Sequence, residues 1–182
     1  MLSRLALRSR PAPSLLKASH LRQSRSLVTL SPNVLYLSSA VAEQPGRAGV
    51  VKSNTDTPLE LTFARPKTIG GKGKGTTPEQ LLAMAMSTSF LDAMNIAASK
   101  QGKNGSLANA RVHAAAFLGH ADNGHDGFAL STNILVENVD DDEVILAARE
   151  LCPFSKALSE GIEVKIMKKA KTSPEDGEEE VD

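Results

Sequence analysis

The chain has 182 residues, and its 21 Lys and Arg residues balance its 21 Asp and Glu residues to a formal net charge of zero. Hydrophobic residues make up 41% of it, enough for the core of one ordinary domain, whereas aromatic residues make up only 3%. So few aromatic rings and so little net charge argue against stacking on nucleic-acid bases and against binding to DNA or an anionic membrane.

The charged residues are unevenly distributed, and residues 1–42 are basic. This segment has no Asp or Glu, is rich in serine and leucine, and contains Arg4, Arg8, Arg10, Lys17, Arg22 and Arg25. Such a composition is typical of a mitochondrial transit peptide. We therefore predict a transit peptide at residues 1–32 and a location in the mitochondrial matrix. A disordered basic arm is the alternative.

The other end of the chain is acidic. Residues 171–182 include SPEDGEEEVD, which cannot bury apolar area and repels itself. We expect a solvated, disordered tail there, with an acidic docking tag as the alternative. One domain is then left between the two ends, at residues 33–170.

The first part of this domain reads as an antiparallel meander. Residues 34–42, 48–53 and 59–63 have the composition and alternation of strands, and the Pro-Gly pair at 45–46 marks a turn between the first two. The glycine-rich loop at 70–75 leads into a helix, but it lacks the spacing of a phosphate-binding P-loop. We interpret it as a mobile entry loop.

A long helix follows this loop. Thr77 is its predicted N-cap, Pro78 suits the first helical position, and Gln80 completes a capping box. Up to Lys100 the helix is apolar on almost every face, which predicts a central helix enclosed on all sides. Asp92 and Asn95 argue against a membrane span.

After the helix, residues 108–119 and 127–138 are predicted to form two more strands. His113, His120 and His125 lie on or beside this hairpin. They lack a thiol or carboxylate at a recognised ligand spacing, so we interpret them as surface residues rather than a metal site.

A second helix is predicted to begin at Asp140 or Asp141 and to end at Leu151, because Pro153 forbids its continuation. A short segment at 156–160 and a strand at 161–167 are predicted to close the domain.

Three motifs resemble the organic hydroperoxide resistance branch of the Ohr/OsmC family. They are GTTPEQLL at 75–82 with the run Thr-Ser-Phe at 88–90, Cys-Pro-Phe-Ser at 152–155, and the weaker Gly-Arg-Ala-Gly at 46–49. Together with the basic N-terminus they suggest a mitochondrial, fungal-type form. The resemblance implies an α+β fold in which two antiparallel sheet halves wrap around the helix at 78–100, in an entwined homodimer.

The resemblance also implies a chemistry, the reduction of organic and lipid-derived hydroperoxides. In this family a thiolate becomes a sulfenic acid, a second cysteine captures it as a disulfide, and a dithiol such as dihydrolipoamide, free or on lipoylated proteins, reduces the disulfide. No bound cofactor or metal is implied. The matching positions are Ser89 for the peroxidatic cysteine, Cys152 for the resolving cysteine, Arg47 for the arginine that stabilises the thiolate, and Glu79 for the glutamate that holds this arginine.

Helix geometry adds a constraint to these positions. Glu79 and Ser89 are ten residues apart, which is about 15 Å along a continuous helix. They cannot share a pocket within one chain, so we expect a composite site built by two subunits. Taken singly, Glu79 could be a charge at a helix start and Arg47 a surface cation.

Ser89 departs from the family pattern, and the chain's one cysteine excludes an intramolecular disulfide. A hydroxyl cannot form the sulfenic acid. We favour a protein that is inactive or attenuated and keeps a pocket for a hydroperoxide or acyl-like ligand, or that regulates an active paralogue. The alternatives are a one-cysteine peroxidase that uses Cys152, and a serine substituted into an ordinary peroxidase.

Overall fold

The computed structural model describes residues 29–43, 48–122 and 126–168. The predicted acidic tail and residues 1–28 of the predicted transit peptide lie outside these ranges. So do the predicted turn at 44–47 and His125.

Helix α1, Pro78–Lys100, begins where its sequence predicts. The Thr77 hydroxyl accepts a hydrogen bond from the Gln80 backbone N–H, and the Gln80 side chain accepts one from the Thr77 N–H, so the capping box is confirmed. Just before it the chain runs against strand β3, Glu60–Ala64, and a Cβ on Gly75 would lie 2.8 Å from the Ala64 nitrogen. Only glycine therefore fits this approach to the helix.

The N-terminal meander is a three-stranded antiparallel sheet of β1 Ser39–Glu43, β2 Ala48–Asn54 and β3 Glu60–Ala64, in that order. Its strands pair in register, with Val41 opposite Lys52 and Val51 opposite Leu61. The first strand begins five residues later than the composition of residues 34–42 suggests, because β2 offers no partners to residues before Ser39. The 3-10 helix η1, Lys67–Ile69, follows β3.

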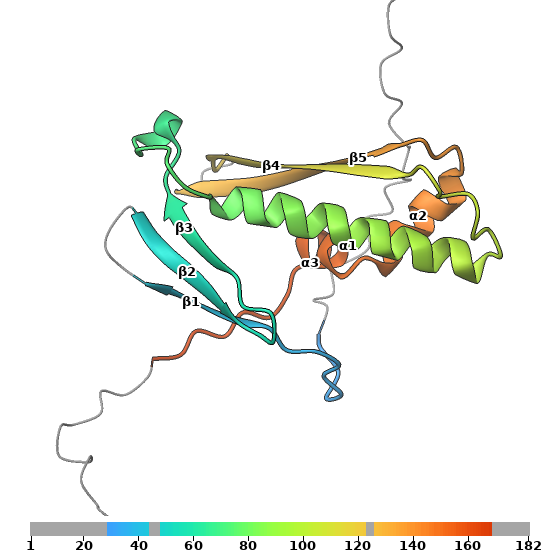
Figure 1. Cartoon of the computed structure of the whole chain (residues 1–182), viewed down its shortest axis with the longest axis horizontal. Helices are drawn as coiled ribbons and strands as arrows, with labels where there is room; N and C mark the ends of the chain where they lie inside the picture. Colours follow the sequence, from blue (N-terminus) through green and yellow to red (C-terminus); the bar gives the residue numbers. More distant parts are fainter. Residues whose placement is uncertain (1–28, 44–47, 123–125, 169–182) are drawn as a thin grey trace, which may run out of the picture.

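The second sheet is the hairpin of β4 Arg111–His120 and β5 Phe128–Glu137, which runs along α1 (Figure 1). Two shorter helices, α2 Asp142–Leu151 and α3 Pro153–Glu160, pack against α1 as well. Asp141 caps α2, and Cys152 separates α2 from α3. The α+β class with two antiparallel sheets and a long helix is thus confirmed.

The hydrophobic core lies where α1 meets α2 and the hairpin. Its buried members are Phe90, Ala93, Met94, Ala97, Ala98, Val144, Ala148 and Cys152. The expectation that α1 is enclosed on all sides is wrong for the single chain. Met84 is 64% exposed and Ile96 42% exposed, because they lie on faces of α1 that nothing in the described chain covers.

The strand predicted at 161–167 is absent. Apart from one bridge at Ile162, the segment forms no ladder, and Val164 and Ile166 are exposed. The alternation of apolar residues there is real, but a strand also needs a neighbour for its backbone hydrogen bonds, and no described strand of the chain supplies one.

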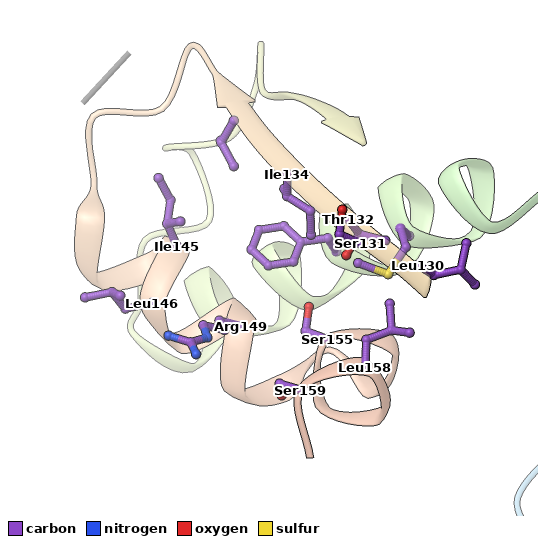
Figure 2. A pocket seen from close by; sticks show the side chains of 13 residues that line it. Leu130, Ser131, Thr132, Ile134, Ile145, Leu146, Arg149, Ser155, Leu158 and Ser159 are labelled. Carbon is purple, nitrogen blue, oxygen red and sulfur yellow. The ribbon is translucent and has the colours of Figure 1, made fainter. Parts of the chain in front are cut away.

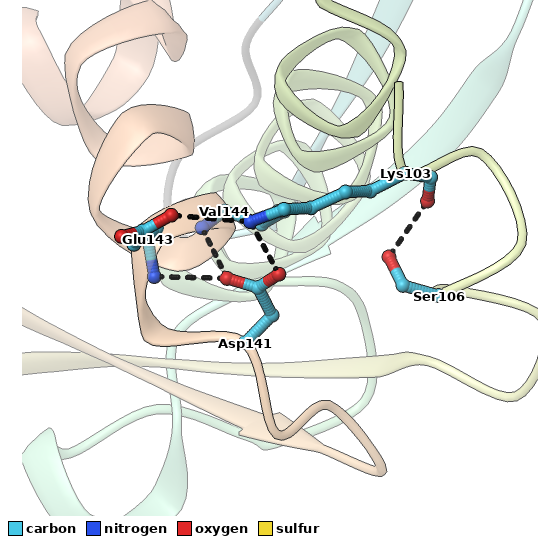
Figure 3. Close-up of polar contacts among 5 residues, drawn as sticks. All are labelled: Lys103, Ser106, Asp141, Glu143 and Val144. Atoms are coloured by element: carbon cyan, nitrogen blue, oxygen red, sulfur yellow. Dashed lines mark hydrogen bonds and ion pairs between the residues drawn. The ribbon is translucent and has the colours of Figure 1, made fainter. Parts of the chain in front are cut away.

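One polar cluster fixes the far end of α1 to the start of α2 (Figure 3). Lys103 Nζ lies 2.8 Å from Asp141 Oδ2 and 3.1 Å from Glu143 Oε2. Asp141 Oδ1 in turn accepts hydrogen bonds from the backbone N–H groups of Glu143 and Val144. The same carboxylate therefore caps α2 and holds the loop that follows α1.

By length and composition alone α1 could cross a membrane, a test that the core helix of a soluble protein also passes. The expectation that it does not span one stays a prediction, based on Asp92 and Asn95, which are both exposed.

Candidate functional site

Ser89 and Cys152 come from different elements and meet. Ser89 lies in the middle of α1, and Cys152 lies at the junction of α2 and α3, where Pro153 ends one helix and starts the next. Ser89 Oγ is 3.4 Å from Cys152 Sγ. The two positions that the resemblance assigns to a pair of reacting cysteines are therefore in contact.

The thiol of Cys152 is fully buried and lies at the N-terminus of α3. Its sulfur accepts a hydrogen bond from the Ser155 N–H at 3.5 Å. Burial raises the pKa of this thiol, but hydrogen bonds from the Ser155 and Ser89 hydroxyls and from the backbone N–H groups of Ser155 and Phe154 outweigh it, so the pKa falls below its ordinary value. Such an environment favours a thiolate.

An open pocket of about 490 Å³ adjoins this pair (Figure 2). Its apolar wall comes from α1, β5, α2 and α3, and includes Met86, Phe90, Leu130, Ile134, Leu146 and Leu158. Ser155, which binds the Cys152 sulfur, is also part of the wall. A ligand in the pocket would thus contact a direct neighbour of the thiol.

Glu79 lies in a different place. It lines a second pocket of about 680 Å³ between the N-terminal end of α1, the meander and the tip of the hairpin, with Phe63, Arg65 and Leu118 among its neighbours. The two pockets share no residue. The separation of Glu79 from Ser89 within one chain therefore agrees with the spacing along the helix. Arg47 lies outside the described residues, so its place beside Glu79 stays a prediction.

The described histidines make pair contacts on the hairpin. His113 Nε2 lies 2.8 Å from Glu137 Oε2, and His120 stacks on Phe128 with ring centroids 5.4 Å apart. Among the described residues, no three His, Cys, Asp or Glu side chains gather where a metal ion could be held.

Two residues of the pocket were not singled out from the sequence. Ser155 stands inside the Cys-Pro-Phe-Ser motif but had no assigned role. Arg149 lies three and four residues after Leu146 and Ile145, on the same face of α2, and lines the pocket with them. That spacing is the signal that could have found it.

Comparison with known proteins places this geometry in context. A family model described as OsmC-like protein matches residues 71–167. The organic hydroperoxide resistance protein of Xanthomonas axonopodis pv. citri is 31% identical over 135 residues, which cover 72% of this chain and 92% of that protein.

Solved structures give the same picture. An organic hydroperoxide resistance protein from Legionella pneumophila superposes with a TM-score of 0.62 at 29% identity, covering 73% of this chain and 96% of the other. A second structure, from Vibrio cholerae, superposes with a TM-score of 0.61 at 32% identity, covering 72% of this chain and 90% of the other. It is described as a putative organic hydroperoxide resistance protein with captopril bound in one of its active sites.

Proposed function

The chain belongs to the OsmC-like protein family, and on that basis we propose that it acts in the response to organic hydroperoxides by binding a hydroperoxide or acyl-like ligand, without the two-cysteine cycle. The observation that carries the proposal is the 3.4 Å contact between Ser89 Oγ and Cys152 Sγ. A hydroxyl occupies the place of the thiol that would react first, while the adjoining pocket is kept.

The chemistry explains why the serine matters. In peroxide reduction a thiolate sulfur attacks one peroxide oxygen, the O–O bond breaks, and the alkoxide leaves as an alcohol after taking a proton. The sulfur is oxidised to a sulfenic acid. Ser89 cannot undergo this change, and its only side-chain partner among the described residues is the Cys152 thiol rather than a base.

The test compares the natural chain with Ser89→Cys. Each protein is reduced, mixed with cumene hydroperoxide and dihydrolipoamide, and the loss of peroxide is followed. We expect the natural chain to be silent and Ser89→Cys to turn over. A second variant, Ser89→Cys with Cys152→Ala, tested without dihydrolipoamide, should consume about one equivalent of peroxide and stop at the sulfenic acid, because neither a second cysteine nor an external thiol is present to resolve it. If the natural chain turns over as fast as Ser89→Cys, the proposal is wrong.

A second candidate function is a one-cysteine peroxidase. The lowered pKa of Cys152 and its place at the start of α3 support it, whereas its complete burial opposes it. Cys152 would be oxidised to a sulfenic acid with release of an alcohol, and two equivalents of an external thiol would return it through a mixed disulfide. Turnover by the natural chain that Cys152→Ala abolishes would establish this function in place of the first.

The proposal extends to assembly and location. A homodimer would bring Arg47 and Glu79 of one chain to Ser89 of the other, and would cover the exposed faces of α1 around Met84 and Ile96. The acid-free N-terminus supports import into the mitochondrial matrix, where lipoylated proteins would supply dithiols. A regulatory role beside an active paralogue belongs to the same proposal. Import of the full chain into isolated mitochondria, compared with a chain that starts at residue 33, tests the location.

A further inference from the structure

Arg149 is the one charged residue that lines the pocket beside Ser155, within the ranges that the structure describes. The rest of the wall is aliphatic or aromatic, apart from four hydroxyl side chains, of Ser131, Thr132, Ser155 and Ser159. The pocket therefore combines a large apolar wall with a single positive charge and no negative one.

Among the described residues, the guanidinium of Arg149 forms no ion pair and no side-chain hydrogen bond, whereas Lys103 near the other end of α2 has two carboxylate partners. Figure 2 shows Arg149 beside Leu146 on α2, with Ser155 and Ser159 on the neighbouring helix α3. Its five N–H donors are thus available to a ligand.

The charge pattern selects a class of ligand. An aliphatic chain fits the apolar wall, and a carboxylate fits the planar, two-pronged donor group of an arginine. The pocket volume of about 490 Å³ is within the usual range for small-molecule sites. We propose that Arg149 binds the carboxylate of a medium-chain fatty acid, free or carrying a hydroperoxide, whose chain occupies the pocket. This inference rests on the proposed function and names its ligand class.

A ligand in this pocket would lie close to the Cys152 thiol. Ser155 lines the pocket and also binds the Cys152 sulfur, so a fatty chain along this wall lies next to the buried thiol. An occupied pocket should slow the alkylation of Cys152 by a small reagent, which provides a readout that does not depend on catalysis.

The experiment measures binding of decanoate and decanamide, at concentrations below those at which they form micelles, to the full-length natural chain by calorimetry. The two probes have the same chain and differ in charge. Decanoate should bind about fivefold more tightly, a difference expected of an ion pair that is partly open to solvent. Arg149→Gln should lose this difference by weakening decanoate alone, and Arg149→Lys should restore part of it. Arg111→Gln, a change at an exposed arginine outside the pocket, is the matched control and should bind like the natural chain.

Each other result overturns the inference, and the results separate it from the proposed function. Equal affinity for both probes in the natural chain would leave a ligand pocket that does not recognise a carboxylate. Equal weakening of both probes by Arg149→Gln would mean that the arginine only supports the wall. If neither probe binds or protects Cys152, both the inference and the proposed ligand pocket fail, and a segment of a second copy becomes the expected occupant.

Discussion

Ser89 Oγ and Cys152 Sγ lie 3.4 Å apart although 63 residues separate them in the chain. The contact joins the middle of α1 to the junction of α2 and α3. Phe90 and Met94 on α1 and Ala148 on α2, a few residues from the two partners, belong to the buried core. Such a core holds the two side chains in one arrangement. The pair is therefore a fixed feature of the fold, and changing the serine oxygen to sulfur tests what the arrangement can do.

The first prediction is that Ser89→Cys forms a disulfide with Cys152 when one equivalent of hydroperoxide is added. A disulfide needs sulfur atoms about 2.05 Å apart, so the chain must close by little more than 1 Å from the observed contact. Intact mass should fall by two hydrogen atoms, which leave with the peroxide oxygen as water, and neither cysteine should then react with an alkylating agent.

Thr88→Cys is the control for this experiment. Thr88 is exposed and precedes Ser89 on α1, and its hydroxyl donates to the backbone carbonyl oxygens of Met84 and Ala85 instead. A thiol at that position points away from Cys152 and should stay free within the monomer. A disulfide in Thr88→Cys and none in Ser89→Cys would contradict the observed contact.

The start of α1 and the end of α2 could be predicted because their signals are local. Thr77, Pro78 and Gln80 form a capping box within one turn, and Pro153 forbids a continuous helix whatever surrounds it. The strand at 161–167 could not be judged in the same way. Its apolar residues do alternate, but whether a strand forms depends on a partner strand, and the described part of the single chain does not supply one.

The candidate site was harder to predict for a related reason. The contact of Ser89 with Cys152 followed only from the family resemblance, because no local pattern links residues so far apart. The pocket needs side chains from four elements, α1, β5, α2 and α3, and therefore appears only after they pack. Arg149 gave a helix-face signal with Ile145 and Leu146, but the sequence does not say what that face meets.

The second prediction concerns the acidity of Cys152. Hydrogen bonds from Ser155 and Ser89 help to lower its pKa against the opposite effect of burial. Ser155→Ala and Ser89→Ala should each raise the pKa, Ser155→Ala by more, because the Ser155 hydroxyl is the larger of the two lowering causes. The measurement is the ultraviolet absorbance of the thiolate as a function of pH, with a Cys152→Ala chain as the blank, and the single cysteine means that only one thiol contributes to the difference.

Ser159→Ala is the matched control for this titration. Ser159 lines the same pocket on the same helix, but its hydroxyl donates to the Lys156 carbonyl oxygen rather than to the sulfur. Its titration should follow that of the natural chain. A thiol pKa that moves equally in all three variants would show that the hydroxyls act through packing and not through hydrogen bonds to Cys152.

The third prediction is a pH-dependent loss of stability in Lys103→Met. The hydrogen bond to Lys103 lowers the pKa of Asp141, and those to Asp141 and Glu143 raise the pKa of Lys103. Because the pKa of Asp141 is lower in the folded than in the unfolded chain, its carboxylate stabilises the fold at pH values above the unfolded pKa. This contribution is lost as the pH falls through the folded pKa. Because the pKa of Lys103 is higher in the folded chain, its ammonium group stabilises the fold at pH values below the unfolded lysine pKa, and this contribution is lost at high pH. Lys103→Met should therefore lower Tm most near neutral pH and least in acid.

Lys52→Met provides the comparison. Lys52 pairs with Glu60 at 3.3 Å, but both side chains are more than half exposed, and such pairs contribute little. We therefore expect Lys52→Met to lower Tm by much less than Lys103→Met does. If Lys103→Met lowers Tm as much in acid as at neutral pH, the loss of stability comes from lost packing of the lysine side chain and not from a lost ion pair.

The last prediction tests the composite site by mixing two silent chains. The first chain carries Ser89→Cys together with Glu79→Ala, and the second is the natural chain, which keeps Glu79 but has no thiol at position 89. Glu79 lines one pocket, whereas Ser89 contacts Cys152 away from it, so the proposed composite site takes the introduced thiol from one subunit and Glu79 from the other. Refolded together, the chains should regain about a quarter of the turnover of the Ser89→Cys protein, because half of the dimers are mixed and each of these holds one complete site.

The control repeats the mixture with Glu79→Ala in the second chain as well, which leaves no complete site in any dimer and should give no turnover. The formation of mixed dimers is checked by native mass spectrometry on each mixture, because the mixed dimer differs in mass from both homodimers, so that silence cannot be confused with a failure of the two chains to pair. A mixture that forms dimers yet stays silent, while Ser89→Cys alone is active, would require Glu79 and the thiol to act from the same chain. Helix α1 would then have to bend or break between positions 79 and 89, against its continuous course from Pro78 to Lys100.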